Sequence, residues 1–360
     1  MNNNNKIIIA TGGTGGHVFP AASLANYFNK KGFISILTTD KKGLKFIDHE
    51  ITKNIRIINS SSFDKKNKIF SLLKITVAVL NSLIFLFKKK PKFIFGMGGY
   101  ASFPVCFAGI ILRIPFIIYE SNLSMGKVNR YLTPLAKKVF VSYKDLEGIE
   151  TKYKNKIIVV GNILREKILN HSNEIEKEID NNLNILVLGG SQAAKIFAEM
   201  LPDIFIKCKK NKINFKIYQH CLNEQKLDLQ KKYDSHDINY ELFSFTFDIL
   251  RYYDLTNLVI TRAGSSALAE LLNCKIPIIS IPLTSSSENH QFKNAEYFKK
   301  KGFGFMIEEK DIKNRLFDLL ETIHKDKSML KLIKANQIKY SDKNVFEKIK
   351  KEIAKLFYEN

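Results

Sequence analysis

Residues 6–20 read KIIIATGGTGGHVFP, which places a short apolar strand directly before a glycine-rich turn. The strand is expected over Lys6–Ala10, and Pro20 suits the first turn of a following helix, where proline needs no backbone partner. Glycines between a strand and a helix let backbone N–H groups approach a phosphate, and the helix dipole favours its charge. The stretch therefore predicts the first unit of a Rossmann-type domain.

A second stretch of the same design occurs one domain length later. Leu183–Leu188 runs into the loop GGSQAA, whose first glycine, Gly189, follows Gly12 by 177 residues. Strand-like and helix-like segments alternate throughout the 360 residues, which is typical of parallel sheets covered by helices. We predict an α/β chain with two tandem Rossmann-like domains facing across a cleft: residues 1–163, residues 164–340, and a Lys-rich helical tail over residues 341–360.

Two further loops follow predicted strands. Phe93–Phe95 leads into GMGGYAS at residues 96–102, and Leu258–Ile260 leads into TRAGSS at residues 261–266. In a doubly wound sheet such turns gather at the carboxyl ends of the strands, where ligands bind. Several helix N-termini around one crevice would suit a diphosphate.

The details of the loops exclude some nucleotide-binding classes. Neither loop carries the lysine of a P-loop, and the third glycine of the dinucleotide fingerprint is replaced by Val18. Asp40 as a ribose-binding acid keeps a dehydrogenase open as an alternative. Because the sequence has no Asp-x-Asp, helix termini and Arg165 or Arg262 would have to neutralise a diphosphate in place of a metal ion.

Basic residues are concentrated in the first half of the chain. Through Arg165 there are 26 basic and 8 acidic residues, a net charge of +18, whereas the rest of the chain has a net charge of +4. This imbalance predicts that the first half faces an anionic partner.

The apolar segment Ile69–Phe87 lies in this half and is flanked by Lys68 and by Lys88–Lys90. A membrane span is disfavoured by Lys74, since a charge at that depth costs about 3 kcal/mol. The segment could also be a buried helix, or a helix that rests one apolar face on a membrane while lysines meet lipid phosphates.

The four cysteines are far apart and no histidine cluster has ligand spacing, so neither a disulfide framework nor a zinc site is expected. The N-terminus lacks an apolar region of signal-peptide length, and we expect that the chain is not exported.

Two side chains beside the glycine loops have functional potential. Glu270 is expected in the first turns of a helix, where a carboxylate is favoured and can accept hydrogen bonds from ribose hydroxyls. His17 follows a double glycine, and an imidazole there suits a general base. A plain helix acid and a packing or capping histidine are the alternatives.

Together these motifs resemble the MurG family of bacterial N-acetylglucosaminyl transferases, in order and spacing over nearly the whole chain. The resemblance is carried by GGTGGHVFP (12–20), GMGGY (96–100), VGN (160–162) with Arg165, GGSQ (189–192), RAG (262–264) with Glu270, and HQ (290–291) with Asn294-Ala295. It implies a GT-B glycosyltransferase with no cofactor and no metal ion. The reaction implied is inverting transfer of N-acetylglucosamine from UDP-N-acetylglucosamine to the muramyl O4 of lipid I, giving lipid II.

The resemblance also implies roles for individual residues. His17 is the family's candidate base. The donor would be bound by Thr14, Gly15, Gly16, Asn122, Arg165, Ser191, Thr246, Ser265, Ser266, Ala267, Leu268, Ala269, Glu270 and Gln291. The acceptor would be bound by Gly98, Gly99, Tyr100 and Ser102. The implied partners are UDP-N-acetylglucosamine, lipid I and the anionic surface of the inner membrane, on whose cytoplasmic face the protein would be peripheral; no nucleic acid is expected.

The sequence departs from the family pattern at three positions. Tyr119 replaces a histidine in the segment YESN, Ala193 replaces a glycine, and Phe103 stands where a small residue is frequent. The role of the family's histidine therefore cannot be transferred to Tyr119.

Three other functions were weighed. Another lipid-directed GT-B enzyme, such as a diacylglycerol glycosyltransferase, would share the nucleotide loops but not the acceptor. A nucleic-acid-binding protein would explain the sequence pI of about 9.6, but no helix-turn-helix or ribonucleoprotein motif is present. A non-catalytic scaffold would have no need of His17, Arg165 and Glu270 together.

Overall fold

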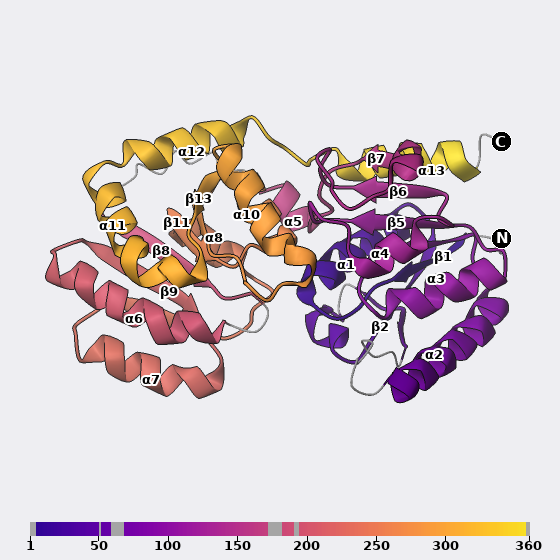
Figure 1. Cartoon of the computed structure of the whole chain (residues 1–360), viewed down its shortest axis with the longest axis horizontal. Helices are drawn as coiled ribbons and strands as arrows, with labels where there is room; N and C mark the ends of the chain where they lie inside the picture. The colour runs from indigo at the N-terminus through magenta and orange to yellow at the C-terminus, as the bar shows by residue number, and fades with distance from the viewer. Residues whose placement is uncertain (1–4, 50–51, 59–67, 172–181, 191–193, 358–360) are drawn as a thin grey trace. The chain divides into compact units, whose positions relative to one another are not determined.

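The computed structural model describes residues 5–49, 52–58, 68–171, 182–190 and 194–357. Two compact units divide the chain: unit 1 comprises Met1–Glu166 and Asp342–Asn360, and unit 2 comprises Lys167–Ser341. Each unit is built on a parallel sheet with helices around it (Figure 1), which confirms the predicted α/β class with two Rossmann-like domains. The C-terminal residues expected to form a separate tail belong to unit 1.

Unit 1 has a seven-stranded sheet with the order β3-β2-β1-β4-β5-β6-β7, and all pairings are parallel. Its strands are β1 (Lys6–Ala10), β2 (Ile34–Thr39), β3 (Ile55–Ile57), β4 (Phe93–Gly96), β5 (Phe116–Glu120), β6 (Lys138–Val141) and β7 (Ile157–Val159). Its helices are α1 (Gly15–Lys30), α2 (Lys68–Lys89), α3 (Ser102–Ile111), α4 (Lys127–Leu132) and α13 (Val345–Phe357), with short 3-10 turns at Gly43–Phe46 and Thr151–Lys156. Helix α5 (Glu166–Leu169) crosses the boundary and lies mostly in unit 2.

Strand β4 shows why both faces of this sheet are covered. Its alternating side chains point to opposite faces. Phe93 and Phe95 pack against Phe28 of α1, with ring centroids 6.3 Å apart in both pairs. Ile94 packs on the other face, close to Gly109 of α3. Buried on both faces, the strand reads as a continuous apolar run.

Helix α1 begins earlier than the sequence suggests. The N–H groups of His17 and Val18 donate to the carbonyl of Thr14, so the helix starts at Gly15. Pro20 consequently lies inside α1, and the prediction that it opens the helix is wrong. Gly13, just before the helix, has a φ of +87°, a conformation that glycine adopts readily, and Gly15 and Gly16 form the start of the helix.

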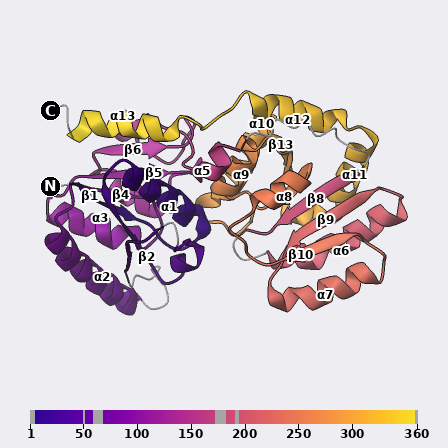
Figure 2. The same cartoon turned by 180° about the vertical axis from the view of Figure 1, so that it is seen from behind.

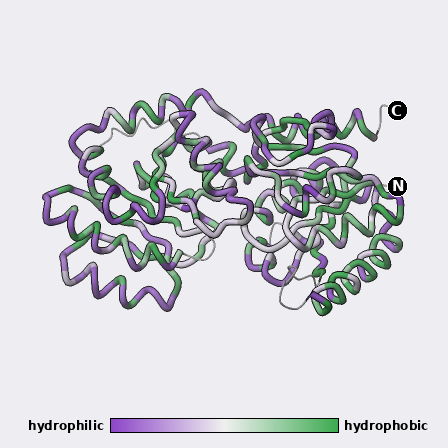
Figure 3. The backbone as a smooth tube through the Cα atoms, viewed as in Figure 1, coloured by the Kyte–Doolittle hydropathy of each residue, from purple (hydrophilic) through white to green (hydrophobic). Residues whose placement is uncertain are grey.

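Helix α2 is rich in hydrophobic residues, as its green tube in Figure 3 shows, and it exposes its large apolar side chains. The residues that it buries are Ser71, Ala78, Ser82, Phe85 and Leu86, whereas Ile69, Phe70, Leu72, Leu73, Val77, Leu80, Ile84 and Phe87 are all more than half exposed. The buried-helix interpretation is therefore wrong. By length and composition alone α2 could cross a membrane, a test that soluble core helices also pass.

Helix α13 returns to unit 1 after the chain has completed unit 2. It buries Val345, Ile349 and Ile353, and Phe346 stacks on Tyr27 of α1 with a centroid separation of 4.7 Å. Just before α13, Asp342 accepts hydrogen bonds from the backbone and side-chain nitrogens of Asn162, at 2.9 and 3.1 Å.

Unit 2 has a six-stranded parallel sheet with the order β10-β9-β8-β11-β12-β13. Strands β10, β9 and β8 can be followed in Figure 2. Its strands are β8 (Leu183–Leu188), β9 (Phe215–His220), β10 (Tyr240–Phe243), β11 (Leu258–Thr261), β12 (Ile278–Ser280) and β13 (Gly304–Met306). Its helices are α6 (Lys195–Lys210), α7 (Asn223–Asp234), α8 (Leu250–Leu255), α9 (Ser265–Asn273), α10 (His290–Lys300), α11 (Ile312–Lys325) and α12 (Ser328–Ile338), with 3-10 turns at Ser287–Asn289 and Glu309–Asp311.

Candidate functional site

In unit 1 the loops after β1 and β4 pack directly on each other. Gly99 has a φ of +79°, and a Cβ atom there would lie 2.4 Å from the carbonyl oxygen of Gly12. A Cβ atom on Gly12 would in turn lie 2.5 Å from that of Ala101. The expectation that these two loops meet at the carboxyl end of the sheet is confirmed.

Asp40 braces the first glycine loop. Its Oδ1 accepts hydrogen bonds from the backbone N–H of Gly13 at 3.0 Å and from that of Gly43 at 2.8 Å. This structural role replaces the ribose-binding role that a dehydrogenase would need.

His17 lies on the first turn of α1, beside the loop after β4. Its Nδ1 is 3.0 Å from the carbonyl oxygen of Met97, and a Cβ atom on Gly98 would come within 3.0 Å of its ring. Since a carbonyl oxygen can only accept, Nδ1 carries the proton, and Nε2 of the neutral ring has the lone pair. A ring held in this tautomer is suited to accept a proton at Nε2.

Glu120 organises the segment that contains Asn122. This buried carboxylate accepts hydrogen bonds from the backbone N–H and the side-chain amide of Asn122, at 3.1 and 2.9 Å. Its second oxygen accepts from the N–H of Gly126 and the amide of Asn129, both at 2.9 Å. Four donors on one buried acid fix the loop, and sequence reasoning had assigned Glu120 no role.

The other site residues expected in unit 1 take varied positions. Thr14 is exposed at the start of α1, and Tyr100 is 49% exposed. Ser102 is buried and donates its hydroxyl to the carbonyl of Gly99 at 2.8 Å, so it stabilises the turn. The guanidinium of Arg165 lies 5.2 Å from the ring centroid of Phe19.

In unit 2 the predicted carboxylate lies on α9, whose N-terminus follows Gly264 and the strand β11. Glu270, in the second turn, is buried and accepts a hydrogen bond from the hydroxyl of Tyr253 at 3.2 Å. Ser265 to Ala269 occupy the first turn and a half, with Ser266 and Ala267 half-buried and Ser265 buried. Thr246 lies in the loop after β10, where its hydroxyl accepts from the N–H of Asp248 at 3.0 Å.

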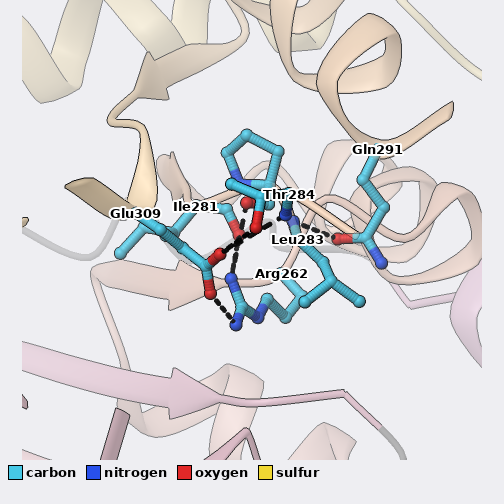
Figure 4. A network of polar contacts seen from close by, with 7 residues as sticks. Arg262, Ile281, Leu283, Thr284, Gln291 and Glu309 are labelled. Carbon is cyan, nitrogen blue, oxygen red and sulfur yellow. Dashed lines mark hydrogen bonds and ion pairs between the residues drawn. The ribbon is translucent and has the colours of Figure 1, made fainter. Parts of the chain in front are cut away.

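The sequence suggests Arg262 as a residue that could neutralise a diphosphate, but in the structure its guanidinium is bound by other groups of the protein. Its guanidinium is bound within the protein by Glu309, at 2.5 Å, and by the carbonyls of Ile281 and Pro282 (Figure 4). Glu309, which sequence reasoning missed, lies in a 3-10 turn far along the chain from Arg262.

The segment around Gln291 is fixed by two amides. Oε1 of Gln291 accepts from the backbone N–H of Leu283 at 3.0 Å. Asn294, buried one turn further along α10, donates to the carbonyl of Ala263 at 3.1 Å and so ties α10 to the loop after β11. The structure thus brings Gln291 and the start of α9 into one unit of the protein, as expected.

Ser191 and the substituted Ala193 lie outside the described residues. Among the residues that the structure does describe, no group of three His, Cys, Asp or Glu side chains is placed to hold a metal ion.

Comparison with known proteins agrees with this architecture. The N-terminal domain of glycosyltransferase family 28 matches residues 7–141, and the C-terminal domain of the same family matches residues 184–356. The structure is similar to the crystal structure of MurG from Acinetobacter baumannii, with a TM-score of 0.75 and 23% identity over 99% of this chain and 100% of that one. A UDP complex of MnaA from S. aureus shares the fold at a TM-score of 0.70, 16% identity and coverage of 97% and 96%.

Curated relatives are closer in sequence. One from Pelagibacter ubique (strain HTCC1062) is 33% identical over 99% of this chain and 100% of its own length. Another from Rickettsia canadensis (strain McKiel) is 36% identical over 85% and 87%. Both are named UDP-N-acetylglucosamine--N-acetylmuramyl-(pentapeptide) pyrophosphoryl-undecaprenol N-acetylglucosamine transferase. With relatives of this identity spanning its length and both domain families matched in order, the chain belongs to glycosyltransferase family 28, among the MurG transferases.

Proposed function

We propose that this chain transfers N-acetylglucosamine from UDP-N-acetylglucosamine to the muramyl O4 of lipid I, giving lipid II. The observation that carries the proposal is the match, over 85% to 99% of the chain, to relatives named as N-acetylglucosamine transferases of this kind. It is supported by glycine loops at the carboxyl ends of both sheets, which suit a diphosphate donor and a diphosphate-linked acceptor.

Unit 2 is the proposed donor site. The N-terminus of α9, with Ser265 and Ser266, would bind the diphosphate, and Glu270 would accept hydrogen bonds from the ribose hydroxyls. Thr246 would lie near the uracil, Ser191 near the diphosphate and Gln291 near the sugar. Glu270 suits its role because the hydroxyl of Tyr253 orients one of its oxygens.

Unit 1 is the proposed acceptor site. The loop with Gly98, Gly99 and Tyr100 would bind the acceptor diphosphate through its backbone. Ser102 would act by holding that turn. Thr14, Gly15, Gly16, Asn122 and Arg165 would complete the contacts to the donor.

The reaction is a direct displacement at the anomeric carbon. The acceptor oxygen forms its bond to that carbon while the bond to the phosphate oxygen breaks, and the electron pair leaves with UDP. His17 would take the hydroxyl proton at Nε2, since Nδ1 donates to Met97. Attack opposite the leaving group inverts the α-linked donor to a β product. N–H donors fixed in advance stabilise the growing charge on UDP more in the transition state than in the ground state.

The proposed cellular position is the cytoplasmic face of the inner membrane, held peripherally by α2. Its large apolar side chains point outward, and the two ends of the helix carry Lys68 and Lys88–Lys90. Burying this face in the headgroup boundary would remove it from water, and each lysine near anionic lipid adds about 1 kcal/mol.

A direct assay tests the catalytic proposal. Purified protein should transfer the sugar from UDP-N-acetylglucosamine to a lipid I analogue, and His17→Ala should lower kcat by about 100- to 10,000-fold while UDP affinity stays near wild type. The exposed His236→Ala is the matched control. Equal transfer to diacylglycerol would favour the alternative acceptor, and undiminished turnover in His17→Ala would exclude His17 as the base.

Flotation with phosphatidylglycerol vesicles tests the membrane proposal. Changing Lys88, Lys89 and Lys90 to Glu should weaken binding by on the order of 100-fold at low salt. A triple change at Lys299, Lys300 and Lys301, three consecutive exposed lysines of unit 2, should have little effect. Equal flotation of both variants and wild type would refute a docking role for the α2 face.

A further inference from the structure

In unit 2 the segment between β12 and α10 is held by a side chain from outside it. Arg262 follows β11, and its side chain is 9% exposed. One guanidinium nitrogen donates to the carbonyls of Ile281 and Pro282, at 3.2 and 3.4 Å. The second terminal nitrogen donates to Glu309 at 2.5 Å (Figure 4). All of these acceptors belong to the protein itself.

Glu309 extends the network to the far end of the same segment. Its second carboxylate oxygen accepts from the hydroxyl of Thr284 at 2.8 Å and from the N–H of Thr284 at 3.3 Å. Burial acts to raise the pKa of Glu309, but the bonds from Arg262 and Thr284 and the positive charge outweigh it, so the pKa lies below its ordinary value. The ionised pair thus binds both ends of the segment 281–284: Arg262 binds Ile281 and Pro282, and Glu309 binds Thr284.

The next contact leads from this segment to Gln291. The N–H of Leu283, between the gripped residues, donates to Oε1 of Gln291 at 3.0 Å. Because Oε1 is already engaged by a donor, the amide has a defined orientation, and its NH2 group points elsewhere. Gln291 would therefore meet a ligand as a hydrogen-bond donor.

The backbone between Thr284 and Gln291 contains residues in an unfavourable conformation that neighbouring contacts must hold in place. Glu288 and Asn289 have φ values of 51° and 54°, in the left-handed region that non-glycine residues rarely adopt. Two such residues in succession persist where the surrounding structure fixes them. A loosened segment would relax them and move the start of α10, where Gln291 lies.

We propose that Arg262 and Glu309 are positioning residues for the sugar half of the donor. By fixing Thr284 and Leu283 they aim the Gln291 amide as a donor toward a sugar hydroxyl, without touching the substrate themselves. The inference rests on the proposed function, since it takes UDP-N-acetylglucosamine as the ligand. It separates two tasks in unit 2: the α9 terminus binds UDP, and the ion pair controls recognition of the attached sugar.

Calorimetry with UDP and with UDP-N-acetylglucosamine tests the proposal. Glu309→Gln should weaken UDP-N-acetylglucosamine binding by about tenfold, the factor that one lost hydrogen bond accounts for, while UDP binding changes less than about twofold. In steady state the donor KM should rise by about the same factor with kcat nearly unchanged. The control is Glu308→Gln, the same change at the neighbouring, more exposed acid that pairs with Lys310; both affinities should stay at wild type.

A second variant covers the case in which Glu309→Gln does not fold. Thr284→Val keeps the ion pair and removes one bond to Glu309, and it should weaken UDP-N-acetylglucosamine binding by about threefold with UDP unaffected. Equal weakening of both ligands, or no change in either, would overturn the positioning role while leaving the proposed function intact. If wild-type protein bound UDP-N-acetylglucosamine no more tightly than UDP, this result would instead refute both the proposed donor and the inference.

Discussion

The two units share a strand order, to which unit 1 adds a seventh strand, but they hold loops at the carboxyl ends of their strands by different means. In unit 1 the loops after β1 and β4 are held by close backbone approach, with Gly99 against Gly12. In unit 2 the segment after β12 is held by a buried ion pair, Arg262 with Glu309, whose bonds reach three backbone groups of residues 281–284. By contrast with Gly99, a Cβ atom on Gly264, just before α9, would have no atom within 4 Å, and its φ is −68°.

This difference separates steric from electrostatic control of similar loops. Where two loops approach as closely as Gly99 and Gly12 do, an added atom is expected to clash. A loop held by a carboxylate and a guanidinium accepts added atoms where space is open, but it depends on the ionisation of the acid. The contact between Gly99 and Gly12 should therefore respond to an added atom, and the region around Arg262 and Glu309 to the ionisation of the acid.

The largest effect is expected for Gly99→Ala. The new Cβ atom would clash with the carbonyl of Gly12 and stand at a φ of +79°, which together should cost about 3 to 5 kcal/mol of stability. Gly264→Ala, the same change in unit 2, should shift stability by less than about 1 kcal/mol, since no atom lies within 4 Å. Thermal unfolding of both variants measures the contrast, and similar shifts in the two would contradict it.

Local sequence patterns were sufficient to predict the two parallel sheets and several residues of the candidate site. The strand-to-glycine-loop pattern at residues 6–16 and 183–190 predicts both sheets, because parallel strands buried on both faces read as apolar runs. The residues beside the glycine loops indicated His17 and Glu270, and the resemblance added Gln291. The structure places His17 beside the loop after β4 and Glu270 on the helix that follows the loop after β11. Their chemical roles stay predictions.

What the sequence did not reveal depends on contacts between distant residues. Nothing near Glu309 indicates its partner Arg262, 47 residues earlier. The dinucleotide motif left Asp40 open as a ribose-binding acid, whereas in the structure Asp40 braces a turn. The outward face of α2 could not be read from a segment that is apolar nearly all round; which side is buried depends on Ser71, Ala78 and Ser82 allowing close packing. Pro20 gave the wrong helix start because glycines at 15 and 16 accept the helical conformation before it.

The next largest effect is a pH-dependent one at Glu309. Its folded pKa lies below the ordinary value of 4.5, so the stabilisation from its ionised form is complete above about pH 4.5 and is lost as the pH falls through the lowered folded value. Glu309→Gln should therefore cost about 2 to 3 kcal/mol near pH 7, and the gap to wild type should narrow toward pH 3. Urea unfolding at pH 7, 5 and 3.5 measures the gap, with Glu308→Gln as control. A gap that is constant or widens in acid would contradict the ion-pair account.

The smallest effect concerns a neutral network in unit 1, at the position where the chain departs from its family. The buried hydroxyl of Tyr119 lies 2.8 Å from that of Ser142, donates to the carbonyl of Gly161 at 3.2 Å and accepts from the N–H of Ile163 at 3.0 Å. These bonds fix the backbone just before the chain leaves unit 1. Tyr119 thus stabilises the exit of the chain, and it supplies no imidazole chemistry.

Tyr119→Phe should destabilise the protein by about 1 to 2 kcal/mol, since it leaves buried backbone groups without their partner. Burial raises the pKa of Tyr119 well above its ordinary value of 10, so the hydroxyl stays neutral and the loss should be the same from pH 4 to pH 9. Tyr131→Phe, at a side chain that is 76% exposed, should change nothing measurable. Urea midpoints across this pH range distinguish this neutral network from the ion pair of unit 2: a Tyr119→Phe loss that varied with pH as the Glu309→Gln loss does would contradict a neutral network.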